Sequence, residues 1–284
     1  MKKMFLFAAI VGYSFVAQAQ VQAPAPSPAG SVSSVVGLTD VKIDYSRPKM
    51  KGRKIFGAEP TVLVPYGKIW RTGANNGTRI TFSDDVKVEG VAVPKGTYLL
   101  LSWPGATEWT IALNKDLALG GGVDQYDASK DAAKFKVKSE KLTEKVETLT
   151  FNISDIADDS KSGKVQLAWE NTSVKFTIGT DYDAKVMESI AKATTVDPYN
   201  YFVAATYYID NNKDPKQALE WVNKAVAANP NPPYWMLYQK ARIQKANGDK
   251  SGAIATANAS LEAAKKGNNV DYQRMNEDLI KSLK

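Results

Sequence analysis

A tryptophan and an arginine stand side by side in residues 66–82, which read YGKIWRTGANNGTRITF. Trp70 offers a large flat apolar surface, and the planar guanidinium of Arg71 carries five donors that suit a carboxylate or a phosphate. Asn75 adds an amide that both donates and accepts hydrogen bonds. These residue types predict a pocket for an anionic or sugar-like small ligand, provided that the surrounding loops converge.

Three further side chains fit the same hypothesis. Arg47 and Arg53 can join Arg71 in a clamp around an anion, and Tyr66 can serve with Trp70 as an aromatic floor. Arg79 is left out, because the alternation of its strand turns it away from the pocket. The predicted ligand-binding residues are therefore Arg47, Arg53, Tyr66, Trp70, Arg71 and Asn75.

A structural role for the same residues is the commoner use of such types. Trp70 would then plug the core, and Arg71 would satisfy buried carbonyl groups or pair with Asp44. The Thr-Gly-Ala-Asn-Asn-Gly run would be a tight connection whose Asn side chains bond their own backbone. The sequence leaves both interpretations open.

The chain contains no cysteine and no histidine. This composition excludes thiolate and imidazole zinc sites, Cys-His and Ser-His-Asp triads, and a histidine general base. No catalytic residue, metal site or cofactor is predicted. The sequence favours a noncatalytic binding or interaction protein, and the alternative is a carbohydrate-active or other hydrolase that uses carboxylates such as Glu108 and Asp116.

Charge gives little support for a nucleic-acid partner. The chain has 37 Lys and Arg against 30 Asp and Glu, and the two signs are mixed along it except in residues 47–54. A duplex-binding surface needs a concentrated row of cations that can neutralise several phosphates. We therefore expect no nucleic acid as a partner.

The first nineteen residues have the pattern of a secretory signal peptide. Lys2 and Lys3 precede an apolar run over residues 4–16, and Ala17-Gln18-Ala19 matches an A-x-A cleavage site. The sequence thus predicts export, to the periplasm or out of the cell, and the missing cysteine argues against a lipoprotein. No later run approaches the roughly 20 apolar residues of a membrane helix, so a soluble mature protein without an integral membrane segment is expected.

The rest of the chain divides into three parts. Residues 20–37 are rich in Ala, Pro and Ser and predict a linker. Residues 38–180 alternate apolar and polar positions with turn residues between the runs, which predicts an antiparallel β domain, a sandwich or an open barrel. Residues 181–284 change to helical spacing and predict an all-α domain that could hold a protein partner on its surface.

Helix signals in the last part are specific. Asp197 and Asp214 each precede a proline, as N-caps do, and Gln217 suggests a capping box with Asp214. The helices are expected near residues 183–195, 198–210, 215–228, 233–247, 250–265 and 271–283.

These helices contain a faint repeat. The series Asp214, Ala218, Val222, Ala225 returns 35 residues later as Asp249, Ala253, Ala257, Ser260. It resembles the tetratricopeptide repeat, in which small residues let two antiparallel helices pack closely. Pro230 fits the closing proline of that pattern, whereas its counterpart is Lys265, and Phe202 and Leu237 stand where the repeat prefers Trp. The resemblance implies two repeat-like helix pairs.

A second resemblance covers the β part over about residues 33–180. Short motifs within residues 45–98 resemble the exported family called "domain of unknown function 2911". The motifs are YSRP at 45–48, KGR at 51–53, IFG at 55–57, VPYG at 64–67, WRTGAN at 70–75 and PKGTY at 94–98. The resemblance implies export and a β fold, and it brings no catalytic residues.

Overall fold

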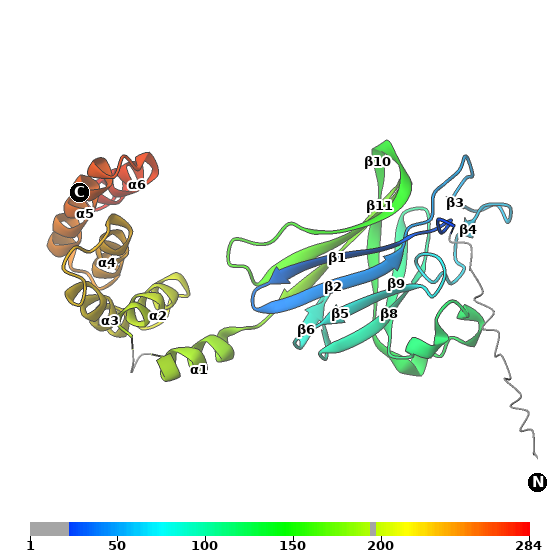
Figure 1. Ribbon diagram of the computed structural model, residues 1–284, viewed down its shortest axis with the longest axis horizontal. Helices are drawn as coiled ribbons and strands as arrows, with labels where there is room; N and C mark the ends of the chain where they lie inside the picture. The colour runs from blue at the N-terminus through cyan, green and yellow to red at the C-terminus, as the bar shows by residue number, and fades with distance from the viewer. Residues whose placement is uncertain (1–22, 194–196) are drawn as a thin grey trace, which may run out of the picture. The chain divides into compact units, whose positions relative to one another are not determined.

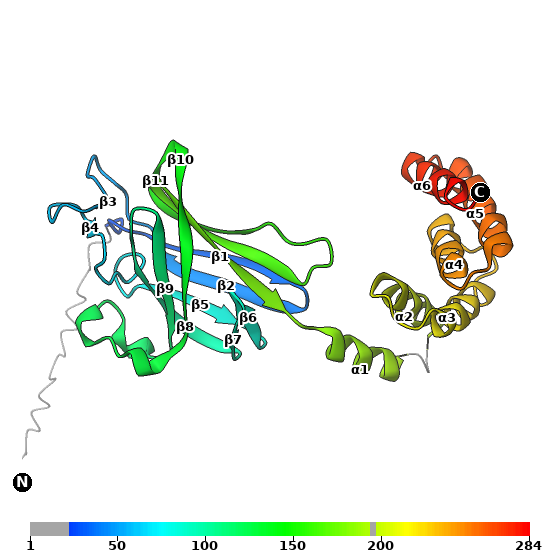
Figure 2. The same ribbon diagram turned by 180° about the vertical axis from the view of Figure 1, so that it is seen from behind.

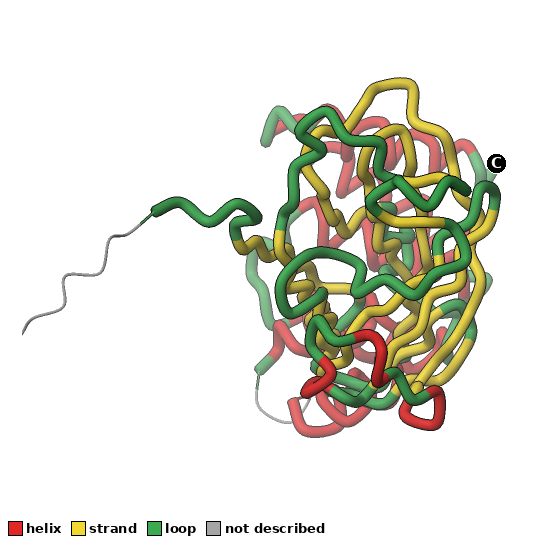
Figure 3. The backbone as a smooth tube through the Cα atoms, turned by 90° about the vertical axis from the view of Figure 1, so that its right-hand side faces the viewer, coloured by secondary structure: helices red, strands yellow, loops and turns green. Residues whose placement is uncertain are grey.

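The computed structural model describes residues 23–193 and 197–284 (Figure 1). The chain forms two compact units, of which the first ends at Asp181 and the second runs from Tyr182 to Lys284. Figure 3 colours the strands and helices of which they are built. The predicted order, an antiparallel β part followed by an all-α part, is confirmed. The predicted signal peptide, residues 1–19, lies outside the described residues.

Eleven strands are described in the first unit. Their bounds are β1 Ala29–Val36, β2 Thr39–Ser46, β3 Phe56–Gly57, β4 Val64–Pro65, β5 Thr78–Phe82, β6 Val86–Val88, β7 Val91–Val93, β8 Gly96–Trp103, β9 Glu108–Asn114, β10 Asp131–Ser154 and β11 Ser162–Thr180.

Nine of these strands form one antiparallel sheet in the order β1-β2-β5-β8-β9-β10-β11-β6-β7, and β3 and β4 form a small parallel pair (Figures 1 and 2). The first part of β10 pairs with β9 and its later part pairs with β11. Between Lys141 and Val146 the register of β10 shifts against β11, an irregularity of the kind that bends a strand. Residues from both ends of the sheet meet in one core.

Alternation along the strands builds that core. In β2 the side chains of Val41, Ile43 and Tyr45 are buried, while the residues between them face outward. The largest fully buried side chains of the unit are Trp109 and Trp169. A smaller cluster, which includes Leu99, Leu101, Ala112 and Leu119, draws on β8, β9 and the 3-10 turn Leu117–Leu119.

The predicted linker, residues 20–37, is wrong over β1. This strand pairs with β2 in register from Ala29↔Ser46 to Val36↔Thr39. Its small polar residues contribute little apolar surface, so composition alone suggested a tether. The strand is held instead by backbone pairing at the edge of the sheet, with Val36 buried and Val32 packed against the core.

Six helices are described in the second unit: α1 Asp183–Ala193, α2 Pro198–Asp210, α3 Pro215–Ala227, α4 Tyr234–Ala246, α5 Lys250–Lys266 and α6 Val270–Lys281. Each begins within one residue of its predicted start, which confirms the helical periodicity. Within the described part of the chain, no helix has the length and apolar character needed to cross a membrane.

The caps and the small residues explain these helices. Asp197 and Asp214 accept hydrogen bonds from Tyr199 N and Lys216 N at 2.8 and 2.9 Å. The capping-box prediction is wrong, because the Gln217 amide donates to Glu220 and not back to the cap.

The two series that repeat every 35 residues occupy comparable places in the structure. Asp214 and Asp249 cap α3 and α5, and the small positions that follow them are buried. These buried residues are Ala218, Val222 and Ala225 in α3 and Ala253, Ala257 and Ser260 in α5. Small side chains at these positions allow the helices to approach closely.

Candidate functional site

A cavity of about 280 Å³ lies in the first unit among the loops that connect β2 to β5. Arg53 and Arg71 are among its lining residues. Trp70 and Trp169 provide aromatic surface, and Leu63 is among its aliphatic lining residues. The structure thus brings together three of the six residues predicted for a ligand site: Arg53, Trp70 and Arg71.

Trp70 also belongs to the aromatic core. Its ring stacks on that of Trp169 at 5.9 Å and 18°, and it meets Phe56 and Trp109 edge to face at 5.7 and 6.1 Å. Its backbone bridges Ser102, with N–O distances of 2.8 and 3.0 Å. Trp70 therefore packs into the core, as the structural interpretation expected. The part of its side chain that stays exposed forms a rigid wall of the cavity.

Arg71 is fixed by the backbone and not by an acid. Its Nη1 donates to Gly121 O at 3.4 Å, and its Nε is buried with no hydrogen-bond partner. The missing side chain of Gly121 lets the backbone of Asn75 lie close to it, because a Cβ there would lie 2.5 Å from Asn75 O. The expected pairing with Asp44 is wrong: the Asp44 carboxylate pairs with Lys42 Nζ at 2.9 Å. Among the described residues, no carboxylate forms a salt bridge with Arg71.

Arg53 is held in a similar way. Its Nε donates to Met50 O at 2.9 Å and its Nη2 donates to Lys49 O at 2.7 Å. A guanidinium has five N–H donors, so three remain for a ligand or water. The carbonyl groups orient the guanidinium and leave its positive charge uncancelled.

The neighbouring Lys54 differs from Arg53. Its Nζ contacts both carboxylate oxygens of Glu59, at 2.8 and 3.0 Å. This hydrogen bond raises the pKa of Lys54 above its ordinary value and lowers the pKa of Glu59 below its own. The charge of Lys54 is therefore compensated locally, and it adds little to the field in the cavity.

Three predicted site residues do not line this cavity. The stem of Arg47 crosses Gly30, where a Cβ would lie 2.7 Å from its Cδ. Tyr66 packs against the core of the unit. The Asn75 amide donates to Ser46 Oγ at 3.0 Å and ties two loops together.

Sequence reasoning missed two contributors. The alternation of Trp169 with Leu167 indicates a buried strand residue and does not reveal that β11 passes the cavity. Gly121 lies in a run of three glycines, and it packs on Arg71 and Asn75. The run of three glycines at 120–122 is a signal for close backbone approach, but nothing in the sequence connects it to Arg71, which is 50 residues away.

The carboxylates of the hydrolase alternative lie elsewhere and are paired. Glu108 contacts Lys136 Nζ at 2.8 Å, and Asp116 contacts Lys130 Nζ at 2.6 Å. The hydrogen bond from Lys130 lowers the pKa of Asp116, which disfavours the protonated form that a general acid needs. Within residues 23–193 and 197–284, no group of three or more acidic side chains could hold a metal ion.

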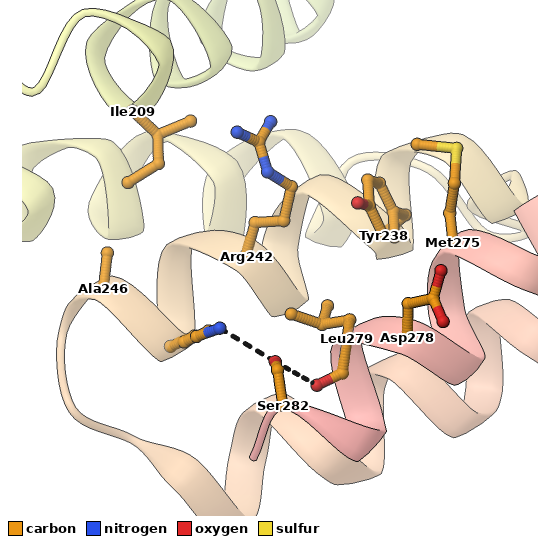
Figure 4. A pocket seen from close by; sticks show the side chains of 9 residues that line it. Ile209, Tyr238, Arg242, Ala246, Met275, Asp278, Leu279 and Ser282 are labelled. Carbon is orange, nitrogen blue, oxygen red and sulfur yellow. Dashed lines mark hydrogen bonds between the residues drawn. The ribbon is translucent and has the colours of Figure 1, made fainter.

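The second unit has a groove of its own, with a volume of about 530 Å³ (Figure 4). Ile209 of α2, Tyr238 of α4 and Leu279 of α6 give it an apolar lining. Arg242 also lines it and is bonded to Asp210 at 2.8 Å and to Gln239 at 2.7 Å. The groove therefore combines an apolar lining with the charged residues Arg242, Lys245 and Asp278.

Comparison with known proteins gives a match that lies in the first unit. No curated protein and no solved structure matches the chain. Residues 27–178 match the model of a family described as "Protein of unknown function (DUF2911)". This match covers more than half of the chain and nearly all of the β unit, and the chain therefore belongs to the DUF2911 family.

Proposed function

We propose that the β unit binds a small molecule that carries a carboxylate or phosphate beside a sugar-like or apolar body. The observation that carries this proposal is the charge of the cavity. Arg53 and Arg71 line it, and its lining contains no acidic side chain. An anion that enters would meet two guanidinium groups whose partners are backbone carbonyl groups.

The energetics favour such a ligand. Charge-assisted hydrogen bonds from arginine to carboxylate or phosphate are stronger than neutral ones, and the planar fork fits both groups. Partial burial reduces screening by water, so each contact gains strength. The wall formed by Trp70 suits the less polar face of a ring and gives selectivity over inorganic anions.

Binding without turnover is the part of the proposal that the lining chemistry supports. Arginines, aromatic rings and aliphatic groups hold and orient a ligand, whereas Glu108 and Asp116 are engaged by lysines away from the cavity. A hydrolase would need a carboxylate beside the bound substrate.

Titration of the full chain with glucuronate and with neutral glucose tests the proposal. We expect saturable quenching of tryptophan fluorescence by glucuronate and none by glucose. Arg71→Lys keeps the charge and removes the fork, and it should weaken binding by about ten- to a hundredfold, since one charged hydrogen bond contributes about 1.5–3 kcal/mol. Arg79→Lys is the matched control, because Arg79 lies outside the cavity.

The melting temperature of each variant separates binding from folding. If Arg71→Lys unfolds at a lower temperature and leaves glucuronate binding unchanged, the residue is structural. Equal binding of glucose and glucuronate would exclude an anion site.

The groove of the helical unit supports a second proposal, a surface for a protein partner. The apolar part of its lining and its size suit a peptide with apolar side chains, and Lys245, which donates to Ser282 Oγ at 2.8 Å, and Asp278 add one charge of each sign. Peptides selected from a random library against the full chain should lose binding to Met275→Glu. They should keep binding to Val270→Glu, which changes an exposed residue outside the groove. Equal binding to both variants would place the peptide elsewhere.

We also propose that the protein is exported, to the periplasm or beyond, and is not a lipoprotein. The basic start, the apolar run and the Ala17-Gln18-Ala19 site support this proposal. Mass spectrometry of the protein from a fractionated native host should find a mature chain that begins at Gln20. A full-length chain in the cytoplasmic fraction would contradict it.

A further inference from the structure

The cavity around Arg71 continues beyond Arg53. A second concavity, of about 350 Å³, shares Ser27 and Arg53 with the first and is also lined by Lys49 and Lys51. We propose that the two concavities form one trough that binds a chain of acidic sugars, with one carboxylate at Arg71 and the next at Lys49 and Lys51. This inference rests on the proposed anion site and extends it to a second subsite.

The second subsite is built on an anchored turn. Met50 is buried, and its N–H donates to Glu147 O at 2.8 Å. The chain reverses at Lys51, whose φ of 50° is unusual for a residue with a side chain, and Arg53 N donates back to Met50 O at 3.1 Å. The anchored turn fixes where Lys49, Lys51 and Arg53 emerge, so the three cations form a defined group.

The charges of this turn are available. In the described parts of the chain, neither Lys49 nor Lys51 forms a salt bridge. The one carboxylate bonded to the turn, that of Glu147, accepts from the backbone N–H of Lys51 at 3.0 Å. Arg53 lies between the two subsites and can contact anionic groups in either. A ligand with a single anionic group would leave the positive charges at one end of the trough without a counter-charge.

Size and lining favour a saccharide chain. Sites for small ligands have volumes of about 300–1,000 Å³, so each concavity is near the lower limit and suits about one ring. Arg71 lines the first concavity, Lys49 and Lys51 line the second, and Arg53 and the uncharged Ser27 line both. A uronate chain carries a carboxylate on every ring, and each ring has a less polar face. Two neighbouring rings could therefore place one carboxylate in each concavity.

The test compares galacturonate with trigalacturonate on the full chain, followed by tryptophan fluorescence and by calorimetry. We expect trigalacturonate to bind at least about tenfold more tightly, because the second contact forms within an existing complex. The double variant Lys49→Gln, Lys51→Gln should reduce trigalacturonate to the affinity of the monomer and leave galacturonate unchanged. Lys87→Gln, Lys95→Gln removes the same charge at exposed positions outside the trough and should change neither.

The outcomes separate this inference from the simpler proposal. If galacturonate binds through Arg71 and trigalacturonate gains nothing, the second subsite is wrong and the anion site stands. If neither sugar binds, both proposals fall. If tri-glutamate binds as tightly as trigalacturonate, the trough recognises only a series of carboxylates, and the assignment to a saccharide is wrong.

Discussion

Arginines of the two units are held in opposite ways. In the β unit, Arg53 and Arg71 donate to backbone carbonyl groups. In the helical unit, Arg242 pairs with Asp210 at 2.8 Å and Arg274 pairs with Asp271 at 3.1 Å. A carbonyl group orients a guanidinium without cancelling its charge, whereas a carboxylate does both. The first arrangement suits a charge kept for a ligand, and the second suits a charge already used within the fold.

The two units also differ in the size of the side chains that pack their cores. The β unit packs Trp70, Trp109 and Trp169 together beside its cavity, and Trp70 and Trp169 line it. The seams of the helical unit are built from small residues such as Ala218 and Ala257, which are fully buried. Large-to-small substitutions in the core should therefore lower the free energy of unfolding most in the β unit. Small-to-large substitutions at buried positions should lower it most in the helical unit.

The largest effect is expected for Trp169→Ala. The side chain is 1% exposed and contacts Trp70 and Phe56, so its removal leaves a cavity in the core. We expect a loss of about 3–5 kcal/mol in the free energy of unfolding of the β unit. Urea denaturation followed by circular dichroism at wavelengths that separate strand from helix measures it.

Trp235→Ala is the control for this change. Trp235 lies in α4, is only partly buried and contacts Phe202 edge to face at 5.0 Å. The Trp235→Ala substitution should leave the unfolding midpoint of the β unit unchanged. A loss below about 1 kcal/mol for Trp169→Ala, within the range of surface substitutions, would show that the aromatic cluster does not hold the unit together.

The helices could be predicted from the sequence because their signals are local. The caps Asp197 and Asp214 mark the starts of α2 and α3, and the helical spacing of apolar residues, which acts within one or two turns, predicts the other helices. The strand alternation gave the β unit for the same reason. The edge strand β1 was missed, because its partner β2 supplies the backbone bonds that its own composition cannot reveal.

The candidate site was only half predictable. Residue type alone suggested Arg53, Trp70 and Arg71 as ligand-binding residues. They line one cavity because the loops after β2 and before β5 fold together. Asn75 and Arg47 have equally suitable chemistry and are used elsewhere. Residue type shows what a side chain can do, while its position depends on long-range pairing that a single sequence does not encode in a readable form.

An intermediate effect is expected for Ala257→Leu. Ala257 is fully buried in α5, and a larger side chain must push α4 or α6 away. Overpacking of this kind costs about 1–3 kcal/mol, and it should appear in the helical transition alone. Ala259→Leu adds the same atoms at an exposed position of the same helix and should be nearly neutral. Equal effects of the two would mean that helix propensity and not close packing sets the stability of α5.

The smallest effect is expected for Asp210→Asn, which makes Arg242 resemble Arg71. The two side chains of this pair are 33% and 45% exposed, so water screens their attraction. We expect a loss of about 0.2–1 kcal/mol, reduced further by 1 M salt. Asp271→Asn breaks the more exposed pair with Arg274 and should lose less, as denaturant midpoints at two salt concentrations can show. A loss above about 2 kcal/mol for Asp210→Asn would exceed what an exposed pair supplies. The pair would then be what fastens α2 to α4, and the contrast between the two sets of arginines would concern stability and not the availability of charge.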